Sequence, residues 1–420
     1  MNRPSFGLRI VITVLILGGF AGLLHAGRPI AIKGGRIVTV TAGVIENGTL
    51  IIRDGRIEAV GKDIRIPSEA DVIDAAGTTI LPGFIDGFTN LGIADFAAFG
   101  SDDDEASDPV APHLHVTDAL NPENRFIPLA RASGVIAAIC APADGNLLTG
   151  QSALIRLKGV SIEEMGIKFP AAVHGCLGEP PKMRYGKMNQ MPMTRMGAAA
   201  LLRQTLIDAQ AYVHGIDEYE KKLAAFQKSG KKDEKEPNPP AIDPKKMALR
   251  PVLEGKIPLI LSADRYDDIL TALRMADEFN LKLILNHGAE AGRMADVLAS
   301  KKVPVIIGPL AHAPLKLETM NSIKENAAWL SRAGVKIAFQ TGSIQNASGL
   351  LAEARLAVAN GLPPEEAMKA LTIYPAQIFG VDAIYGSLEV GKSASLVIFD
   401  GDPLAMRSQV KMVFIDGKKM

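Results

Sequence analysis

The sequence predicts an α/β protein in which a (β/α)8 barrel of the TIM type is inserted into a small β-sandwich formed from both chain ends. Three observations predict this architecture. Turn-separated β-rich segments occur near both ends of the chain, and strand-length apolar runs alternate with amphipathic stretches between them. The composition is 47% hydrophobic, and a chain of 420 residues with this composition is long enough to build two structural units.

Residues 1–26 are typical of an export segment. Arg3 and Arg9 both precede an apolar run at 10–24. Ala26 is a small residue of the kind found at signal cleavage sites. The run is shorter than the roughly 20 apolar residues that a bilayer span needs. We therefore expect a cleaved signal peptide and a periplasmic or extracellular chain. An uncleaved N-terminal anchor is the alternative, because Leu24 is an imperfect residue three places before the cut.

Both ends of the remaining chain show the sequence pattern of an antiparallel sheet, in which short β-rich segments alternate with turns. Turn pairs such as Asp54-Gly55 and Asp416-Gly417 separate the β-rich segments. These segments are 36–40, 49–53, 56–60 and 78–81 near the start, and 395–399 and 411–415 near the end. We expect residues 27–81 and 385–420 to form one composite β-sandwich domain and residues 82–384 to form the inserted barrel.

The middle of the chain alternates between strand and helix patterns. The strand-length runs are 84–90, 135–141, 153–158, 171–177, 257–263, 281–287, 303–308 and 336–340. Residues 266–280 have apolar residues at helical spacing, and a long helix is expected from Arg195 toward Lys228. The mixed-charge segment 228–244 is expected to lie at the surface. Strands in such an arrangement are expected to be parallel and buried on both faces.

Charge and cysteine content limit the possible partners. Lys plus Arg and Asp plus Glu are equal at 46 each, and no basic stripe breaks the balance, so a nucleic-acid partner is not expected. Small molecules or proteins remain as partners. Cys140 and Cys176 both fall in strand-like runs and are expected to be buried free thiols. A bridge between them is the alternative in an oxidising compartment.

Short motifs occur in a characteristic order along the chain. They are Leu81-Pro82-Gly83-Phe84-Ile85-Asp86, Asp118-Ala119-Leu120-Asn121-Pro122, Gly150-Gln151-Ser152, Asn286-His287-Gly288, Gly386-Ser387-Leu388-Glu389-Val390-Gly391 and Asp400-Gly401-Asp402-Pro403. In this order they resemble the amidohydrolase superfamily, and within it the imidazolonepropionase-like and dihydroorotase-like hydrolases. The resemblance covers nearly the whole chain after the export segment. It implies a nominal hydrolase acting on non-peptide C–N bonds.

The resemblance also implies a metal site at the carboxyl-terminal mouth of the barrel. In that family one or two divalent metals are held by a His-x-His motif on strand one, a carboxylate or modified lysine on strand four, histidines on strands five and six, and an aspartate on strand eight. Such a metal lowers the pKa of bound water to about 7 and polarises the scissile carbonyl.

This chain lacks most of those ligands. The former ligand positions are occupied by Phe88 and Asn90 on strand one, Ile260, Ser262 and Asp264 on strand five, and Gly342 after strand eight. Glu179 and His287 are the two residual candidates. Two ligands make a poor zinc site, because catalytic zinc usually has three protein donors.

Two hypotheses follow. In the first, the protein is a catalytically impaired amidohydrolase, a pseudoenzyme that needs no cofactor. It binds a small-molecule ligand or an active paralogous amidohydrolase, as part of an oligomer. In the second, it is an active hydrolase of cyclic amides or small peptides, in which zinc or another divalent metal binds Glu179, His287 and a loop donor such as His113 or His115. A solvated loop is the plainer interpretation of His113-Leu114-His115, because a metal needs a fixed backbone.

Overall fold

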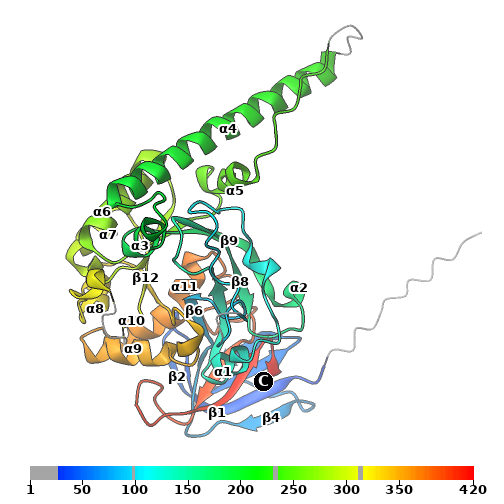
Figure 1. Cartoon of the computed structure of the whole chain (residues 1–420). Coiled ribbons are helices and arrows are strands. Elements are labelled where there is room, and N and C mark those ends of the chain that lie inside the picture. Colours follow the sequence, from blue (N-terminus) through cyan, green and yellow to red (C-terminus); the bar gives the residue numbers. More distant parts are fainter. Residues whose placement is uncertain (1–26, 97–99, 230–234, 311–315) are drawn as a thin grey trace, which may run out of the picture.

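The computed structural model describes residues 27–96, 100–229, 235–310 and 316–420, so the predicted export segment lies outside the described residues. Two eight-stranded sheets organise the chain (Figure 1). Within the described ranges, no helix is both long enough and apolar enough to cross a membrane.

The first sheet joins the two ends of the chain. Its strands are β1 (Ile30–Val38), β2 (Val44–Arg53), β3 (Arg56–Gly61), β4 (Asp71–Asp74), β5 (Thr79–Pro82), β14 (Leu396–Phe399), β15 (Val410–Ile415) and β16 (Lys418–Lys419). β14 pairs with β5, which brings the last part of the chain against the first. Asp54 and Gly55 both have positive φ, as a two-residue hairpin turn between β2 and β3 requires. A separate apolar core that includes Ile32, Leu50 and Phe414 holds this sheet.

The second sheet forms the barrel. Its strands are β6 (Phe84–Thr89), β7 (Val135–Cys140), β8 (Leu148–Arg156), β9 (Gly166–Cys176), β10 (Leu259–Ala263), β11 (Leu283–His287), β12 (Val305–Ile307) and β13 (Ile337–Phe339), paired in chain order. The first and last strands meet through the segment after β13. There the Gly342 amide donates to the Phe88 carbonyl at 3.1 Å and the Thr341 amide donates to Asp86 Oδ1 at 3.1 Å. The predicted fold class is confirmed.

One strand departs from the expected parallel arrangement. β8 is antiparallel to both of its neighbours, β7 and β9. Residues 141–147 connect β7 to β8, and this connection is too short for the crossover of a dozen or more residues that a parallel pair requires. The expectation that all barrel strands run parallel was therefore wrong at β8. The reversal places the carboxyl end of β8 at the barrel end opposite the mouth.

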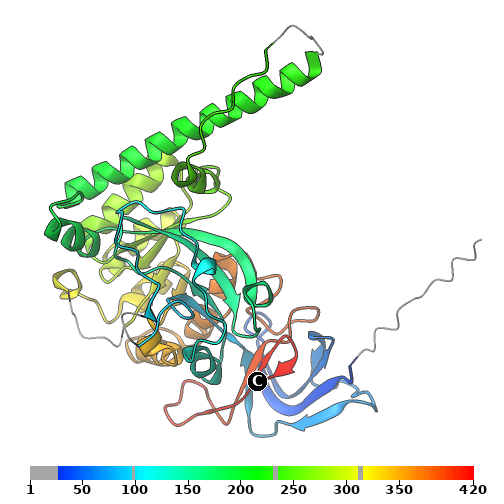
Figure 2. The same cartoon turned by 45° about the vertical axis from the view of Figure 1, so that its right-hand side comes forward.

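Helices cover the outside of the barrel (Figure 1). They are α1 (Phe126–Ala132), α2 (Ile162–Met165), α3 (Glu179–Lys187), α4 (Arg195–Ser229), α5 (Pro244–Leu253), α6 (Tyr266–Phe279), α7 (Ala295–Ser300), α8 (Asn326–Arg332), α9 (Leu350–Ala359), α10 (Pro364–Leu371) and α11 (Ile373–Ile378). The predicted long helix is α4, whose buried residues all lie between Ala198 and Val213. Its second half projects away from the barrel (Figure 2). Cys140 on β7 and Cys176 on β9 are buried free thiols.

Candidate functional site at the barrel mouth

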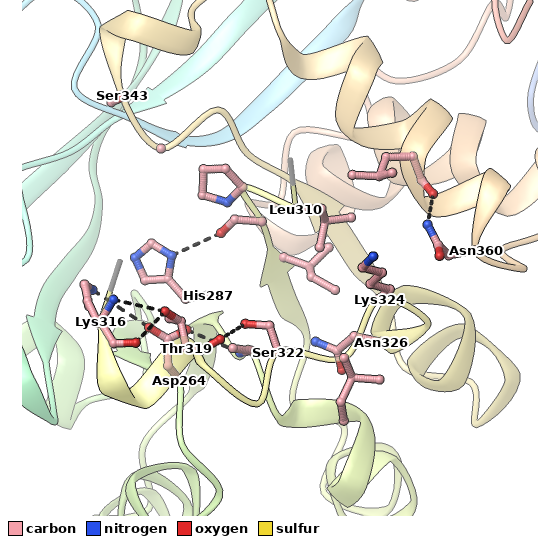
Figure 3. Close-up of a pocket in the computed structure, with 17 residues that line it drawn as sticks. Asp264, His287, Leu310, Lys316, Thr319, Ser322, Lys324, Asn326, Ser343 and Asn360 are labelled. Atoms are coloured by element: carbon pink, nitrogen blue, oxygen red, sulfur yellow. Dashed lines mark hydrogen bonds and ion pairs between the residues drawn. The ribbon is translucent and has the colours of Figure 1, made fainter. Parts of the chain in front are cut away.

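A cavity of about 740 Å³ opens at the carboxyl ends of the barrel strands. Its walls come from the segments that follow β10, β11, β12 and β13 (Figure 3). Polar side chains on these walls include Asp264, His287, Lys316, Asn326 and Ser343, and apolar ones include Ile307, Leu310 and Leu356. A mouth of this size and mixed chemistry falls in the range typical of small-molecule sites.

His287 lines the cavity and forms an ion pair with Asp144. It is the last residue of β11 and has a φ of 66°, a left-handed conformation that is uncommon for a residue other than glycine. Its Nε2 lies 2.7 Å from Asp144 Oδ2 and its Nδ1 lies 3.1 Å from the Gly308 carbonyl oxygen. When Asp144 is ionised it accepts a hydrogen bond from His287 Nε2, while Nδ1 faces both the Gly308 carbonyl oxygen and, at 3.3 Å, the side-chain Nε2 of Gln340.

The protonation states of the pair follow from their contact. Burial disfavours the charge of each group, but the hydrogen bond and charge of Asp144 outweigh it and raise the pKa of His287. Burial likewise acts to raise the pKa of Asp144, but the hydrogen bond and charge of His287, the hydrogen bond of Ser262 and the charge of Lys316 together outweigh it and lower that pKa. The two side chains are 18% and 15% exposed, so solvent screens their attraction only weakly.

Asp144 also joins the ends of two neighbouring strands. Its Oδ1 accepts a hydrogen bond from Ser262 Oγ at 2.6 Å, while its other oxygen contacts His287. Ser262 stands on β10 and is bonded in turn by Asn286 Nδ2 at 2.8 Å. Gln340, after β13, donates to Asn286 Oδ1 at 2.9 Å and to the Gly308 carbonyl at 2.8 Å. The carboxylate of Asp144 thus connects positions on β10 and β11 that in the resemblance belong to metal ligands.

Phe88 places an aromatic ring where strand one of a metal-dependent relative has a histidine. The ring is buried, and its centroid lies 5.6 Å from that of His174 and 6.0 Å from that of His287. Neither ring nitrogen of His174 has a hydrogen-bond partner among the described residues, and burial lowers the pKa of His174 to about 4. His174 is therefore neutral and packs as an aromatic ring inside the barrel.

Asn90 and Gly342 hold the conformation of the backbone at the mouth. Asn90 Nδ2 donates to Asp103 Oδ2 at 2.6 Å, and its Oδ1 accepts from the Ile344 amide at 2.9 Å. Gly342 has a φ of 70°, and a Cβ at this position would lie 3.0 Å from Pro309 Cγ. Both residues therefore hold the connection between β6 and the segment after β13.

A second charged network lies on one side of the cavity. Lys316 Nζ is 3.9 Å from both Asp264 Oδ2 and Glu318 Oε1. Burial raises the pKa of Glu318 to about 7. Arg195, the first residue of α4, pairs with Asp268 at 2.9 Å and with Glu318 at 3.4 Å. This network connects the start of the long helix to the wall of the mouth.

The remaining predicted residues lie apart from the His287 pair. Ile260 is fully buried in β10, and Glu179 begins α3, where its amide donates to Glu318 Oε2 at 2.8 Å. Glu179 is not among the cavity-lining residues. The ring of His115 meets that of Phe169 edge to face, with centroids 5.2 Å apart, and His115 Nδ1 lies 4.0 Å from Asp118 Oδ2. None of these side chains contacts His287 or Asp144 in the described part of the chain.

The donor set at the mouth does not fit a divalent metal. Within the described ranges, no three His, Cys, Asp or Glu side chains are grouped so that they could hold an ion. A metal needs an unprotonated imidazole nitrogen, and both nitrogens of His287 already have protein partners. Binding a metal at this position would first require breaking the Asp144 pair.

Sequence reasoning missed Asp144, Lys316 and Glu318. A signal for Asp144 existed, because it follows β7 by four residues at the carboxyl end of a barrel strand, where functional side chains gather. Lys316 and Glu318 lie after β12 with no motif around them, so their approach to Asp264 depends on the fold alone.

Comparison with known proteins places the chain in a family. The sequence profile of the amidohydrolase family matches residues 193–420. The crystal structure of an amidohydrolase from Thermotoga maritima is 35% identical and superposes with a TM-score of 0.86, covering 93% of this chain and 99% of that one. This protein belongs to the amidohydrolase family.

Curated relatives are more distant. Amidohydrolase tasK of Hapsidospora irregularis is 23% identical over 89% of this chain, and the match spans 39% of the length of tasK. An imidazolonepropionase from a Geobacillus species is 23% identical, and the match covers 85% of this chain and 84% of the relative. These similarities support the resemblance drawn from the motifs.

Proposed function

We propose that this protein is a binding member of the amidohydrolase family that does not itself hydrolyse C–N bonds. It takes a small molecule at the barrel mouth or pairs with an active relative. The ion pair between His287 and Asp144 is the single observation that supports this proposal most strongly. It lies at the cavity that His287 lines, and both nitrogens of this residual histidine have protein partners.

The absence of the parts that hydrolysis needs from the residues at the former ligand positions supports this proposal. A hydrolase must generate a nucleophile and move a proton, and each task needs a group within hydrogen-bond reach of the substrate with a free position. His287 has no free nitrogen, Ser262 is engaged with Asp144 and Asn286, and Gly342 has no side chain to act as a base. Phe88 and Asn90 offer no replacement, since one is apolar and the other holds two backbone-positioning contacts.

The cavity itself suits a small ligand with both polar and apolar parts. Lys316 and Asp264 offer opposite charges on one wall, and Leu310 and Leu356 offer apolar surface elsewhere. A zwitterionic or amide-bearing molecule matches this lining, because it can meet both charges and still bury its carbon skeleton.

The test is a hydrolysis assay on the purified full chain. Zn, Mn and Co are each supplied with a panel of cyclic amides, imides and dipeptides, and turnover is compared with that of His287→Ala. We expect no turnover above that of the variant, together with saturable binding of panel members that is weakened by Lys316→Ala. Metal-dependent turnover that disappears in His287→Ala contradicts the proposal and supports an active hydrolase with a reduced metal site.

A further inference from the structure

A second cavity, of about 670 Å³, lies where the terminal sheet meets the barrel. Arg156, at the carboxyl end of β8, lines it together with residues of β3 and β16. Because β8 runs antiparallel to its neighbours, this cavity lies at the opposite end of the barrel from the mouth. Nothing in the proposed ligand binding at the mouth involves it.

Basic side chains outnumber acidic ones in the lining of this cavity. Five of its residues are basic, namely Arg28, Arg56, Arg156, Lys158 and Lys418. The acidic lining residues are Asp54 and Asp416. The chain as a whole has no net charge, so this excess of positive charge is a local feature.

Two of the five basic side chains form ion pairs, Arg28 with Asp71 at 3.2 Å and Arg156 with Asp416 at 2.7 Å, and the other three have no ion-pair partner within 4 Å among the described residues. Arg56 donates to the Gly391 carbonyl at 2.7 Å and Lys158 donates to the Ile415 carbonyl at 3.1 Å, contacts with neutral groups that fix the side chains. Burial lowers the pKa of Lys158, and the nearby charges of Lys418 and Arg156 act in the same direction, whereas the charge of Asp416 acts to raise it.

The carboxylate of Asp416, which lines this cavity, already accepts several hydrogen bonds. Asp416 accepts hydrogen bonds from Arg156 at 2.7 Å, from Ser393 at 2.7 Å and from Tyr385 at 3.2 Å. Arg156 Nε, by contrast, is buried and has no acceptor among the described residues. Leaving such a donor unsatisfied costs about 1–3 kcal/mol. The Arg156 side chain as a whole is 31% exposed and lines the cavity.

We propose that this cavity binds a phosphate group through Arg156, Lys158, Arg56 and Lys418. Guanidinium groups match the geometry of phosphate oxygens, and lysines add point charge. The phosphate can belong to a soluble phosphorylated compound or to an anionic lipid headgroup. Gly27 also lines the cavity and directly follows the predicted export segment, which ends at Ala26, so a membrane source is chemically reasonable.

The experiment measures binding to the full chain by isothermal titration with inorganic phosphate and by flotation with vesicles. The vesicles are pure phosphatidylcholine or a mixture of phosphatidylcholine with phosphatidylglycerol, all at low ionic strength. Lys418→Glu tests the site because it reverses an exposed charge on the two-residue strand β16 without touching the core. Lys411→Glu is the matched control, an exposed lysine of the neighbouring strand β15 that does not line the cavity.

We expect wild type to bind phosphate saturably, Lys418→Glu to bind at least about tenfold more weakly, and Lys411→Glu to stay within about twofold of wild type. Arg56→Gln should weaken binding in the same direction. A preference for phosphatidylglycerol vesicles that Lys418→Glu abolishes assigns the phosphate to a lipid. Phosphate binding without that preference assigns it to a soluble compound. The proposal is overturned if wild type shows neither saturable phosphate binding nor a vesicle preference, or if both lysine variants weaken binding equally.

Discussion

The Asp144→Asn substitution tests how much the ion pair with His287 stabilises the fold. It removes the negative charge that faces His287 but keeps an oxygen of similar size for Ser262. Removing one partner of a buried ion pair costs roughly 3–5 kcal/mol, because the other charge is left buried. The slight exposure of both side chains and the retained amide favour the lower end, so we expect a loss of about 3 kcal/mol in the free energy of unfolding.

The pH dependence of this loss follows from the two pKa shifts. The pKa of His287 is raised, so its contribution is fully present below its unfolded value of 6.5 and disappears as pH rises through the folded value. The pKa of Asp144 is lowered, so its contribution is present above its unfolded value of 3.8 and disappears as pH falls through the folded value. The difference between wild type and Asp144→Asn should therefore be largest between about pH 4 and 6.5.

Urea unfolding across this pH range, with the His287 ring followed by NMR, measures both effects. The pKa of His287 should fall in the variant. Asp103→Asn is the matched control, since Asp103 near the same mouth accepts from the neutral Asn90 amide and its change should cost only about 1 kcal/mol. Equal losses in the two variants, or an unchanged pKa of His287 in Asp144→Asn, would refute the ion-pair account.

Three further predictions concern positions around the mouth. Phe88→His should create zinc binding that is detectable by calorimetry and is lost on adding His287→Ala. Zinc–nitrogen bonds of about 2.0–2.1 Å place two imidazole centroids roughly 5 Å apart, and the ring of Phe88 now lies 5.6 Å from that of His174 and 6.0 Å from that of His287. Absence of zinc binding in Phe88→His contradicts this prediction. Burial raises the pKa of Asp86 to about 7, so wild type should lose stability, on the order of 4 kcal/mol, as pH rises from about 4 through 7. Asp86→Asn should flatten that dependence in urea unfolding, and an unchanged slope counts against it. Gly342→Ala should cost about 1–2 kcal/mol in the same assay, more than Gly77→Ala, which has a similar φ but open space.

The sequence predicted the order and type of the barrel strands because each one is a short apolar run bounded by polar or glycine residues. It did not predict the reversal of β8. The information was present, since only seven residues separate Cys140 from Leu148, and a connection of that length makes a hairpin. The resemblance to parallel barrels outweighed this local constraint in the prediction.

The sequence pointed to the residues at the former metal-ligand positions, but not to the side chains that contact His287 in the structure. Phe88, Asn90 and Gly342 were identified because they stand at motif positions on a strand or shortly after one. Asp144 was missed because it lies on a loop, and its approach to His287 depends on a path that no periodic pattern describes. Glu179 was chosen by its position after strand four, yet it is the backbone amide of Glu179, and not its carboxylate, that contacts Glu318.

Metal content is the most direct test of the claim that an ion pair, and not a metal, occupies the mouth of this barrel. Elemental analysis of the purified full chain, before and after incubation with excess zinc and removal of unbound ions, should give the same low metal content as His287→Ala. Near-stoichiometric metal in wild type that is lost in His287→Ala would contradict the account.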